Sequence, residues 1–460
     1  MSYQLESHIV EKLKLFFTQF DFIDKVVIFG SRAKHDANPK SDIDLCIYSL
    51  EMTAKEFIKL KIELDELPIL YKIDIVHFEK SNDELKKNIE KDGKYFFIKE
   101  LPFNLFFKNI SAKPFQIEKK DYKETGKYPV VDQGKKFIVG YSDNEEKFFK
   151  LENPIIIFGD HTRIIKYVDF DFIIGADGTK ILLPYHENID VKYAYYKLLH
   201  TKIENLGYSR HYKLLKEKIF QKPSLTKQKE IAKTLDKAQE LIELRKESIK
   251  KLDALSKSIF IDMFGDPVSN PKKWDFDKMG NYMKIRRGAS PRPIAKFIGN
   301  DIPWIKIGDA TNGNDLYIET TKVKIILEGK DKSVYLKKGS LVFANCGVSL
   351  GFSRILKIDG CIHDGWLSFE DISTKLDEIF VLKFINNSTQ RLRDSASGGT
   401  QPNLNIDIMK NFKIFIPPLS IQKQFVSAIQ KIEQQKALYE EQLTTLQENF
   451  DALLAQSFKA

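Results

Sequence analysis

The sequence predicts a multidomain α+β protein in which a small α/β head precedes two β-rich blocks, each followed by a long helix. Three observations predict it: uninterrupted amphipathic stretches over residues 224–264 and 418–460, and an alternation of short apolar strands and helices within residues 1–100. The expected segments are the head (1–100), the first β-rich block (101–223), the central helix (224–264), the second block (265–417) and the C-terminal helix (418–460).

Both long stretches have the apolar spacing of an α-helix. Between Pro223 and Gly265, apolar residues recur every three or four positions, and charged residues fill the other face. Such a narrow stripe, on a helix far longer than the average of ~11–12 residues, is typical of a coiled coil. We therefore expect the two helices to pair with each other as a coiled coil within one chain.

The two long helices are related as an internal repeat. Gln228-Lys229 recurs as Gln422-Lys423, an offset of 194 residues, and Pro223 and Pro417 precede them at the same offset. An apolar register that is kept along the whole stretch indicates a duplication. Since a β-rich block precedes each helix, the repeated unit is a block plus its helix.

Charge is unevenly distributed along the chain. The first 100 residues hold 16 Lys+Arg and 19 Asp+Glu, a net charge of −3, whereas the whole chain carries +9, which leaves +12 for the remainder. A basic body points to a polyanionic partner. No apolar run reaches the ~18 residues of a membrane span, and the N-terminus lacks the pattern of a signal peptide. We expect a cytoplasmic protein without a membrane partner.

The head places three aspartates on neighbouring strands. The apolar strand Lys25–Phe29 ends at Gly30, and Asp42 and Asp44 stand two residues apart at the next strand. That spacing puts both side chains on one face, and Asp74 joins them if the third strand pairs alongside. The cluster is comfortable around a divalent cation, and hard oxygen ligands suit Mg²⁺, which would bridge triphosphate oxygens and activate an attacking hydroxyl.

A glycine-serine turn next to these aspartates completes a phosphoryl-transfer site. Gly30 lets the backbone approach a phosphate, Ser31 can donate a hydrogen bond to it, and Arg32 can neutralise nearby charge. Two sets of residues are predicted: catalytic and metal-binding Asp42, Asp44 and Asp74, and nucleotide-binding Gly30, Ser31 and Arg32.

The order Gly30-Ser31, Asp42-x-Asp44, Asp74 resembles the minimal nucleotidyltransferase family of the polymerase-beta-like superfamily. The resemblance covers roughly residues 8–98. It implies Mg²⁺ and a nucleoside triphosphate as cofactors of the head if the head is active. Members of this family often act as antitoxins that nucleotidylate a partner toxin, so the resemblance leaves the head's acceptor open.

The body resembles the specificity subunit of a type I restriction–modification system. The phrases that carry this resemblance are Gly126-x-Tyr-Pro-Val-x-Asp-Gln-Gly134, Phe158-Gly-Asp-His-Thr-Arg163, Met263-Phe-Gly-Asp266, Ile302-Pro-Trp-Ile305 and Pro417-Pro-Leu-x-x-Gln422. It implies two target-recognition domains that each read half of a split site in double-stranded DNA. It also implies that the two long coiled-coil helices pack antiparallel, space these domains, and dock methyltransferase (M) and restriction (R) subunits.

The resemblance and the chemistry of base recognition together suggest DNA contacts. Arginine pairs with guanine, and asparagine or glutamine pairs with adenine, while lysines hold phosphates. The candidates are Arg163, Lys166, Arg210, His211, Lys213, Arg287, Arg292, Lys306, Asn345, Arg354, Gln401 and Asn403. The body has no nuclease, methyltransferase or P-loop motif, so we expect it to be non-catalytic and to need no cofactor.

Two other hypotheses remain open from the sequence. The chain could be a nucleotidyltransferase, modifying a protein or a nucleic acid, that uses the body as a targeting module. It could also be a coiled-coil scaffold that binds no DNA. Two dissimilar β-rich blocks favour the DNA-specificity function, because a scaffold does not need divergent blocks. An ordinary specificity subunit would begin near residue 101, so the head is an addition whose role for the assembly the sequence does not reveal.

Overall fold

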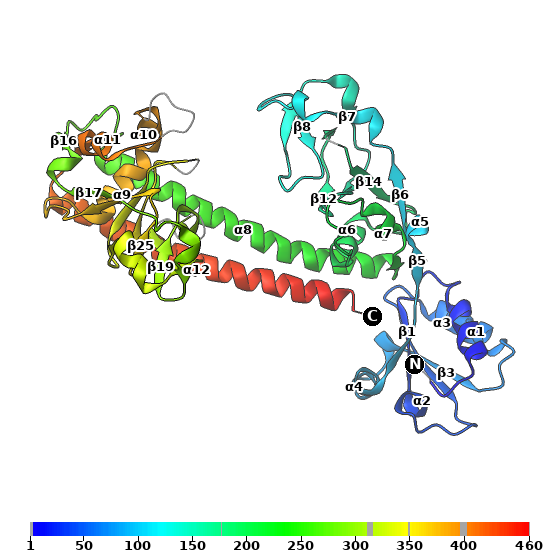
Figure 1. Ribbon diagram of the computed structural model, residues 1–460. Helices are drawn as coiled ribbons and strands as arrows, with labels where there is room; N and C mark the ends of the chain where they lie inside the picture. The colour runs from blue at the N-terminus through cyan, green and yellow to red at the C-terminus, as the bar shows by residue number, and fades with distance from the viewer. Residues whose placement is uncertain (1–2, 176, 311–315, 348–349, 396–402, 460) are drawn as a thin grey trace. The chain divides into compact units, whose positions relative to one another are not determined.

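The computed structural model describes residues 3–175, 177–310, 316–347, 350–395 and 403–459, which form two compact units. The first unit comprises Met1–Leu241 with Leu446–Ala460, and the second comprises Ile242–Thr445. The head and the first β-rich block lie in the first unit and the second block in the second (Figure 1). The predicted α+β class with two long helices is confirmed. In the described part of the chain, no helix is long and apolar enough to span a bilayer.

The head is a four-stranded sheet with helices on both faces (Figure 1). The strand order is β3-β2-β1-β4, with β2 and β3 parallel and the other pairs antiparallel. Leu13 and Leu60 bring α1 and α3 onto one face, and Ile89 brings α4 onto the other, against Val27. The elements are α1 (Ser7–Phe17), β1 (Lys25–Phe29), α2 (Gly30–Lys34), β2 (Ile43–Tyr48), α3 (Ala54–Asp65), β3 (Ile73–His77), α4 (Asp83–Asp92) and β4 (Lys94–Ile98).

The first β-rich block has two sheets that share an apolar core. Their strand orders are β10-β13-β8-β9, with β7 paired to β13, and β12-β11-β14-β6. Both sheets contribute to the core, for example through Val131, Ile157 and Phe172. Pairing of β5 with β15 joins the two ends of the block. The elements are β5 (Glu100–Pro102), α5 (Phe103–Phe106), β6 (Phe107–Ile110), β7 (Gln116–Ile117), β8 (Tyr128–Val131), β9 (Gly140–Ser142), β10 (Phe148–Phe149), β11 (Ile155–Gly159), β12 (Ile165–Val168), β13 (Phe172–Gly175), β14 (Thr179–Pro184), α6 (Val191–His200), α7 (Tyr212–Lys216) and β15 (Ile219–Gln221).

The second β-rich block repeats this plan with different strands. Its sheets have the orders β17-β26-β23-β24-β20 and β18-β21-β19-β25-β22, and pairing of β16 with β27 joins its ends. The elements are β16 (Phe276–Lys278), β17 (Lys284–Arg287), β18 (Ile298–Gly299), β19 (Ile302–Ile305), β20 (Tyr317–Ile318), β21 (Lys324–Ile325), β22 (Val334–Leu336), β23 (Leu341–Ala344), β24 (Ser353–Leu356), β25 (Gly360–Ile362), β26 (Trp366–Glu370), α9 (Glu378–Asn387), α10 (Thr389–Ser395), α11 (Ile406–Asn411) and β27 (Lys413–Phe415).

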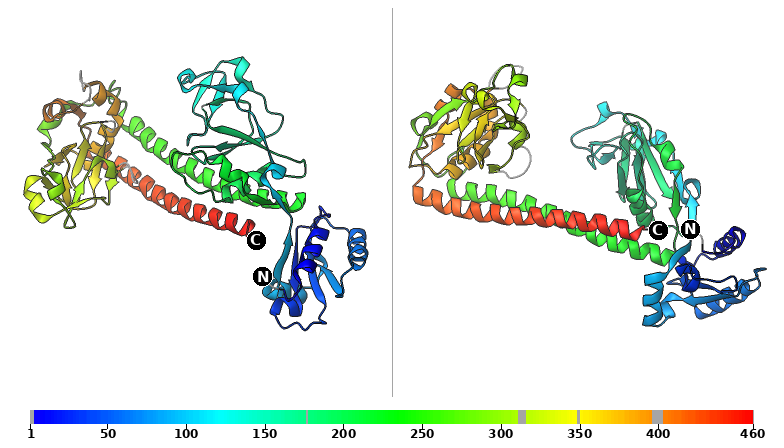
Figure 2. Two further views of the ribbon diagram at one scale, coloured as in Figure 1. Left: turned by 45° about the vertical axis from the view of Figure 1, so that its right-hand side comes forward. Right: turned by 60° about the horizontal axis from the view of Figure 1, so that its bottom comes forward.

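The two long helices are α8 (Leu225–Phe264, 40 residues) and α12 (Leu419–Ser457, 39 residues). Within the second unit their facing parts run side by side, which both views of Figure 2 show. Along the contact, residue numbers rise on α8 and fall on α12. Arg245 lies over the ring of Tyr439, Lys436 donates to Asp253 at 2.6 Å, and Phe260 contacts Phe425 with ring centroids 5.6 Å apart. This order is that of an antiparallel pair, as the resemblance implies.

The repeated glutamines explain why the beginnings of the two helices match in sequence. Gln228 and Gln422 are both fully buried, and each ties its long helix to the residue that caps a helix of its own block. The contacts are equivalent: Gln228 accepts from the Asp190 N–H and donates to the carbonyls of Asn188 and Pro223, and Gln422 accepts from the Asp377 N–H and donates to the carbonyls of Lys375 and Pro417. Because a buried amide must be fully hydrogen-bonded, this clamp fixes each block on its helix.

Lys197 on α6 carries a buried charge where the first block meets the end of α12. Its Nζ donates to Gln221 Oε1 at 3.0 Å and lies 4.8 Å from the ring centroid of Phe458. Burial lowers the pKa of Lys197 to about 8. Below pH 8 the folded and unfolded states both hold the proton, so the cost of burying the charge is felt in full. Between pH 8 and about 10.5 the unfolded state binds more protons, so the free energy of unfolding rises with pH.

Replacing Lys197 by methionine is therefore expected to stabilise the protein at pH 7, by about 1–2 kcal/mol. The difference from the parent should shrink as the pH approaches 10, because the parent lysine then loses its proton in the folded state. Chemical denaturation of both proteins at pH 7 and pH 10 measures this. Lys202→Met, at an exposed position, is the control and should show no such trend. A difference that stays constant with pH contradicts the assignment.

Candidate functional site

The predicted carboxylates of the head meet at one end of its sheet. Asp44 and Asp74 are register partners on β2 and β3, and Asp44 also faces Phe29, the last residue of β1. Asp42 directly precedes β2. Burial, and then the charges of Asp74 and Asp42, raise the pKa of Asp44. The neighbouring negative charges of Asp42 and Asp74 therefore disfavour the ionised form of Asp44.

Gly30 meets a steric requirement at this edge. Its φ is +69°, a backbone conformation that favours glycine, and a Cβ built there would lie 2.4 Å from Oδ2 of Asp44. Any side chain would displace the carboxylate. Gly30 and Ser31 open the short helix α2 directly after β1, so the glycine-serine turn and Asp44 share one edge of the sheet.

Arg32 fixes the loop that carries Asp42. Only 1% of Arg32 is exposed, and its guanidinium donates to the backbone carbonyls of Gln4, Ser41 and Asp42 at 2.5–3.1 Å. The guanidinium also lies over the ring of Tyr71. Its hydrogen bonds fix the position of Asp42, and the predicted direct contact with a nucleotide is not available to a side chain this deeply buried.

Lys72 is a member of the site that the sequence analysis missed. Its Nζ lies 2.6 Å from Oδ2 of Asp74 and 3.6 Å from Oδ2 of Asp42, and the hydrogen bond to Asp74 raises the pKa of Lys72. Two carboxylates thus share an ammonium ion. The available signal was the lysine two positions before Asp74, which places both side chains on one face of the strand.

The donor set at this edge fits a hard divalent cation in its chemistry. Three aspartate side chains stand at one end of the sheet, and oxygen is the ligand atom that Mg²⁺ prefers. Among the described residues, however, no three His, Cys, Asp or Glu side chains converge closely enough to hold a metal ion. The ammonium of Lys72 bridges two of the carboxylates instead, so binding of a cation requires Lys72 to move aside.

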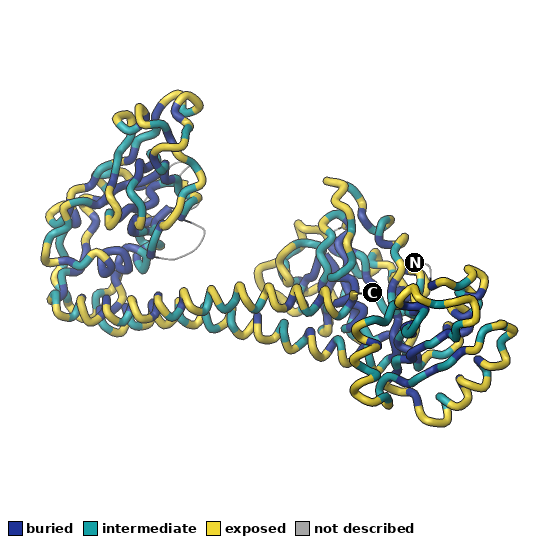
Figure 3. Tube along the Cα trace, turned by 90° about the horizontal axis from the view of Figure 1, so that it is seen from below, coloured by how far each residue is buried: buried dark blue, intermediate teal, exposed yellow. Residues whose placement is uncertain are grey.

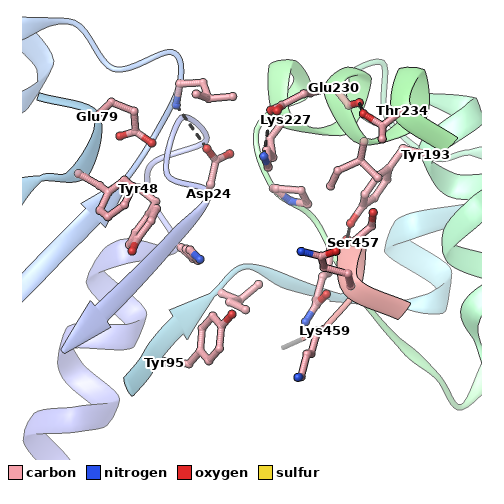
Figure 4. Close-up of a pocket in the computed structure, with 18 of the residues that line it drawn as sticks. Asp24, Tyr48, Glu79, Tyr95, Tyr193, Lys227, Glu230, Thr234, Ser457 and Lys459 are labelled. Atoms are coloured by element: carbon pink, nitrogen blue, oxygen red, sulfur yellow. Dashed lines mark hydrogen bonds and ion pairs between the residues drawn. The ribbon is translucent and has the colours of Figure 1, made fainter. Parts of the chain in front are cut away.

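A cavity of about 550 Å³ lies at the opposite end of the head's sheet (Figure 4). Lys25 and Tyr48 are register partners at that end, and the Lys25 ammonium lies over the rings of Tyr48 and Tyr95. Asp24, also at the cavity, accepts hydrogen bonds from the backbone N–H groups of Ser224 and Leu50 at 2.8 and 3.3 Å. The cavity is therefore separate from the carboxylates, and Asp24 anchors the head to the beginning of α8.

The predicted DNA contacts of the first block divide into buried and exposed residues. Lys166 is 4% exposed and donates to three backbone carbonyls, and His211 is fully buried. Arg163 donates to the carbonyl of Ile203 at 3.0 Å. Arg210 and Lys213 are at the surface. Lys166 and His211 therefore hold loops in place, because no part of their side chains is free to reach a base; as direct contacts these two predictions were wrong.

In the second block, several predicted contacts gather around one loop. Arg287 donates to the carbonyl of Asp364, Arg292 lies 3.6 Å from that carboxylate, and Lys306 lies over the ring of Trp304. The other candidates do not share one location. Asn345 is fully buried, so the prediction that it contacts DNA at the surface was wrong. Arg354 is half-buried and donates to the Ser353 carbonyl, Asn403 is exposed, and Gln401 lies outside the described residues.

Two family models match the chain. The type I restriction modification DNA specificity domain matches residues 106–254 and 271–448, and the polymerase beta nucleotidyltransferase domain matches residues 11–100. The first model covers more than half of the chain in two segments, in agreement with the duplication.

The chain is also similar to individual specificity subunits. The MjaIX specificity subunit of Methanocaldococcus jannaschii is 25% identical over 52% of this chain and 60% of its own length. The EcoR124I/EcoR124II specificity subunit of Escherichia coli is 23% identical over 72% of this chain and 86% of its own length. The solved S subunit from M. genitalium is 18% identical, with a TM-score of 0.48, over 79% of this chain and 96% of its own. The chain belongs to the type I restriction–modification DNA specificity family, and it carries a polymerase-beta-type nucleotidyltransferase domain ahead of its two specificity segments.

Proposed function

We propose that this chain selects the DNA sequence on which a type I restriction–modification complex acts, with each β-rich block reading one half of a bipartite site. The observation that carries the proposal is the duplication: two blocks with different strands are fixed to two matched helices by the same glutamine clamp. Two β-rich blocks that differ in their strands, held on two equivalent helices, suit the recognition of two different half-sites. The net charge of +12 outside the head supports a polyanionic partner.

The partners that follow from this proposal are double-stranded DNA, methyltransferase subunits and restriction subunits. Leucines exposed on the long helices support docking of other subunits there, because Leu244, Leu255 and Leu438 are 52%, 46% and 47% exposed. Figure 3 displays these helices as largely exposed or half-buried along their middle parts. The proposal assigns recognition to this chain and leaves methylation, ATP use and cleavage to its partners, which act in the cytoplasm.

The head is proposed to be an Mg²⁺-dependent nucleotidyltransferase that uses a nucleoside triphosphate. The carboxylates Asp42, Asp44 and Asp74 would hold the metal, which supplies charge neutralisation at the phosphates. Gly30 and Ser31 would meet a phosphate; this is supported by the lack of a side chain at Gly30 next to Asp44 and by Arg32, which keeps the Asp42 loop in position. Nucleotidylation of a protein or nucleic acid selected by the body is the second candidate function, favoured by the intact carboxylate set.

Methylome sequencing tests the specificity function. A host that expresses this chain with a cognate methyltransferase is expected to carry one split methylation motif, composed of two defined half-sites and an undefined gap. Deletion of residues 1–100 should leave this motif unchanged if recognition belongs to the body. The absence of any split motif that depends on this chain, although the methyltransferase is active with another specificity subunit, contradicts the proposal.

A further inference from the structure

An exposed tyrosine stands on a tightly held loop of the first block. Tyr208 is 97% exposed and lies in the loop between α6 and α7, beside Gly207, whose φ is +68°. Its exposure would mean little on a loose loop, since single exposed apolar side chains are common. This loop, however, is held by hydrogen bonds at Ile203, Leu206 and Tyr212, and two of the residues that hold it were expected from the sequence to touch DNA.

His211 and Arg163 anchor the loop from inside the block. The ring Nε2 of His211 accepts the N–H of Leu206 at 3.1 Å, so its proton lies on Nδ1, which donates to the carbonyl of Asp160 at 3.0 Å. Arg163 donates to the carbonyl of Ile203 at 3.0 Å. Asp160 also accepts the N–H of Tyr212. A buried neutral histidine and a carboxylate thus set the path of the chain on both sides of Tyr208.

The ring of Tyr208 rests on a platform made by other loops. It stacks on His161 with ring centroids 5.4 Å apart and an angle of 14° between the planes. The backbone N–H of His161 donates to Oε1 of Gln133, whose Nε2 donates to the carbonyl of Asp177. A Cβ on Gly178 would lie 2.5 Å from the Gln133 Nε2 and 2.7 Å from the His161 ring. The platform itself is therefore closely packed, and Tyr208 lies beside it with almost its whole surface exposed to solvent.

The surroundings of Tyr208 suit a nucleic acid. Arg210, two residues further on, has a side chain that is 66% exposed, and its ion pair with Asp177 at 3.6 Å is exposed on both sides and therefore weak. Lys202 and Lys213 are also exposed. A rigid aromatic ring next to available cations matches the pattern in which cations hold phosphates and an apolar surface meets a base.

We propose that Tyr208 is a base-contacting residue that determines specificity in the half-site read by the first block, with His161 as its support and Arg210 as the neighbouring cation. This inference rests on the proposed function. The contact is made by the ring face or edge, as with a thymine methyl group or a partly unstacked base. His211 and Gln133 are positioning residues, since they act through the loops that they hold.

The test uses the full-length chain co-expressed with a methyltransferase, and it measures DNA binding and the methylation motif. Tyr208→Ala is expected to weaken binding to the split site on the order of tenfold or more, and to relax the methylation motif in one half-site only. Tyr208→Phe keeps the ring and should keep the motif. Tyr185→Ala is the matched control: Tyr185 is an exposed tyrosine that contacts a neighbouring histidine at the other end of β14, and its removal should change nothing.

The outcomes separate this inference from the proposed function. If the parent protein yields no split motif, the specificity function itself fails. If the parent yields one and Tyr208→Ala leaves both the motif and the affinity unchanged, the role of Tyr208 is refuted while the specificity function stands. Equal relaxation of both half-sites, or equal losses in Tyr208→Ala and Tyr185→Ala, also refutes it. Thermal unfolding of each variant confirms that the block is folded.

Discussion

Replacing Asp42 and Asp44 together by asparagine is expected to reduce nucleotide transfer by the head by about 10²–10³-fold or more. The two side chains supply negative oxygens at the edge where Gly30 opens α2, and asparagine keeps their size while it removes the charge that binds a divalent cation. The measurement is incorporation of label from ATP, in the presence of Mg²⁺, into the chain itself or into proteins and nucleic acids of a cell lysate.

A matched variant separates loss of chemistry from loss of charge. Asp83→Asn with Glu84→Gln removes the same charge from the first turn of α4, which follows the end of β3 distant from Asp74, and should keep the labelling of the parent. Equal labelling by the parent and the Asp42/Asp44 variant contradicts the mechanism. The absence of any label from the parent contradicts an active head. Thermal unfolding verifies that both variants retain the fold.

The two long helices and the duplication could be predicted because they produce periodic patterns in the sequence. Apolar spacing identified α8 and α12 to within a few residues at their ends, and the repeat at an offset of 194 residues anticipated that Gln228 and Gln422 have equivalent positions. The structure adds the reason, since each glutamine makes the same three hydrogen bonds inside its own unit. The repeated Gln-Lys pair therefore corresponds to a buried hydrogen-bonded contact that occurs once in each unit.

Individual site residues could be predicted only where one strand or turn determines the geometry. The spacing of Asp42 and Asp44 and the glycine at position 30 are local features, so they could be read from a short stretch, and the structure adds the positive φ at Gly30. Burial is decided by packing of distant segments, and this is why Lys166 and His211 resembled surface cations but hold loops inside the block. Residues chosen by type alone cannot be separated into those that support a loop and those that project from it.

Shortening both long helices by one turn is expected to narrow the gap between the two DNA half-sites by about one to two base pairs. Four residues of α-helix correspond to about 6 Å, nearly two base-pair steps of ~3.4 Å. They also carry about 40° of rotation beyond a full turn, close to the rotation of one base pair. The deletion removes residues 243–246 from α8 and 439–442 from α12, which takes out the stacked Arg245 and Tyr439 together. The methylation motif gives the gap directly.

Two companion variants make this expectation decisive. Duplicating the same four residues in each helix should widen the gap by the same amount, because the antiparallel contacts Asp253–Lys436 and Phe260–Phe425 keep their partners. Deletion in α8 alone should instead lower the free energy of unfolding, because it moves the residues of α8 out of register with their partners on α12. A folded paired deletion and a folded paired duplication that both retain the parent's gap would mean that helix length does not set the spacing, and the half-sites would then have to be positioned by the partner subunits.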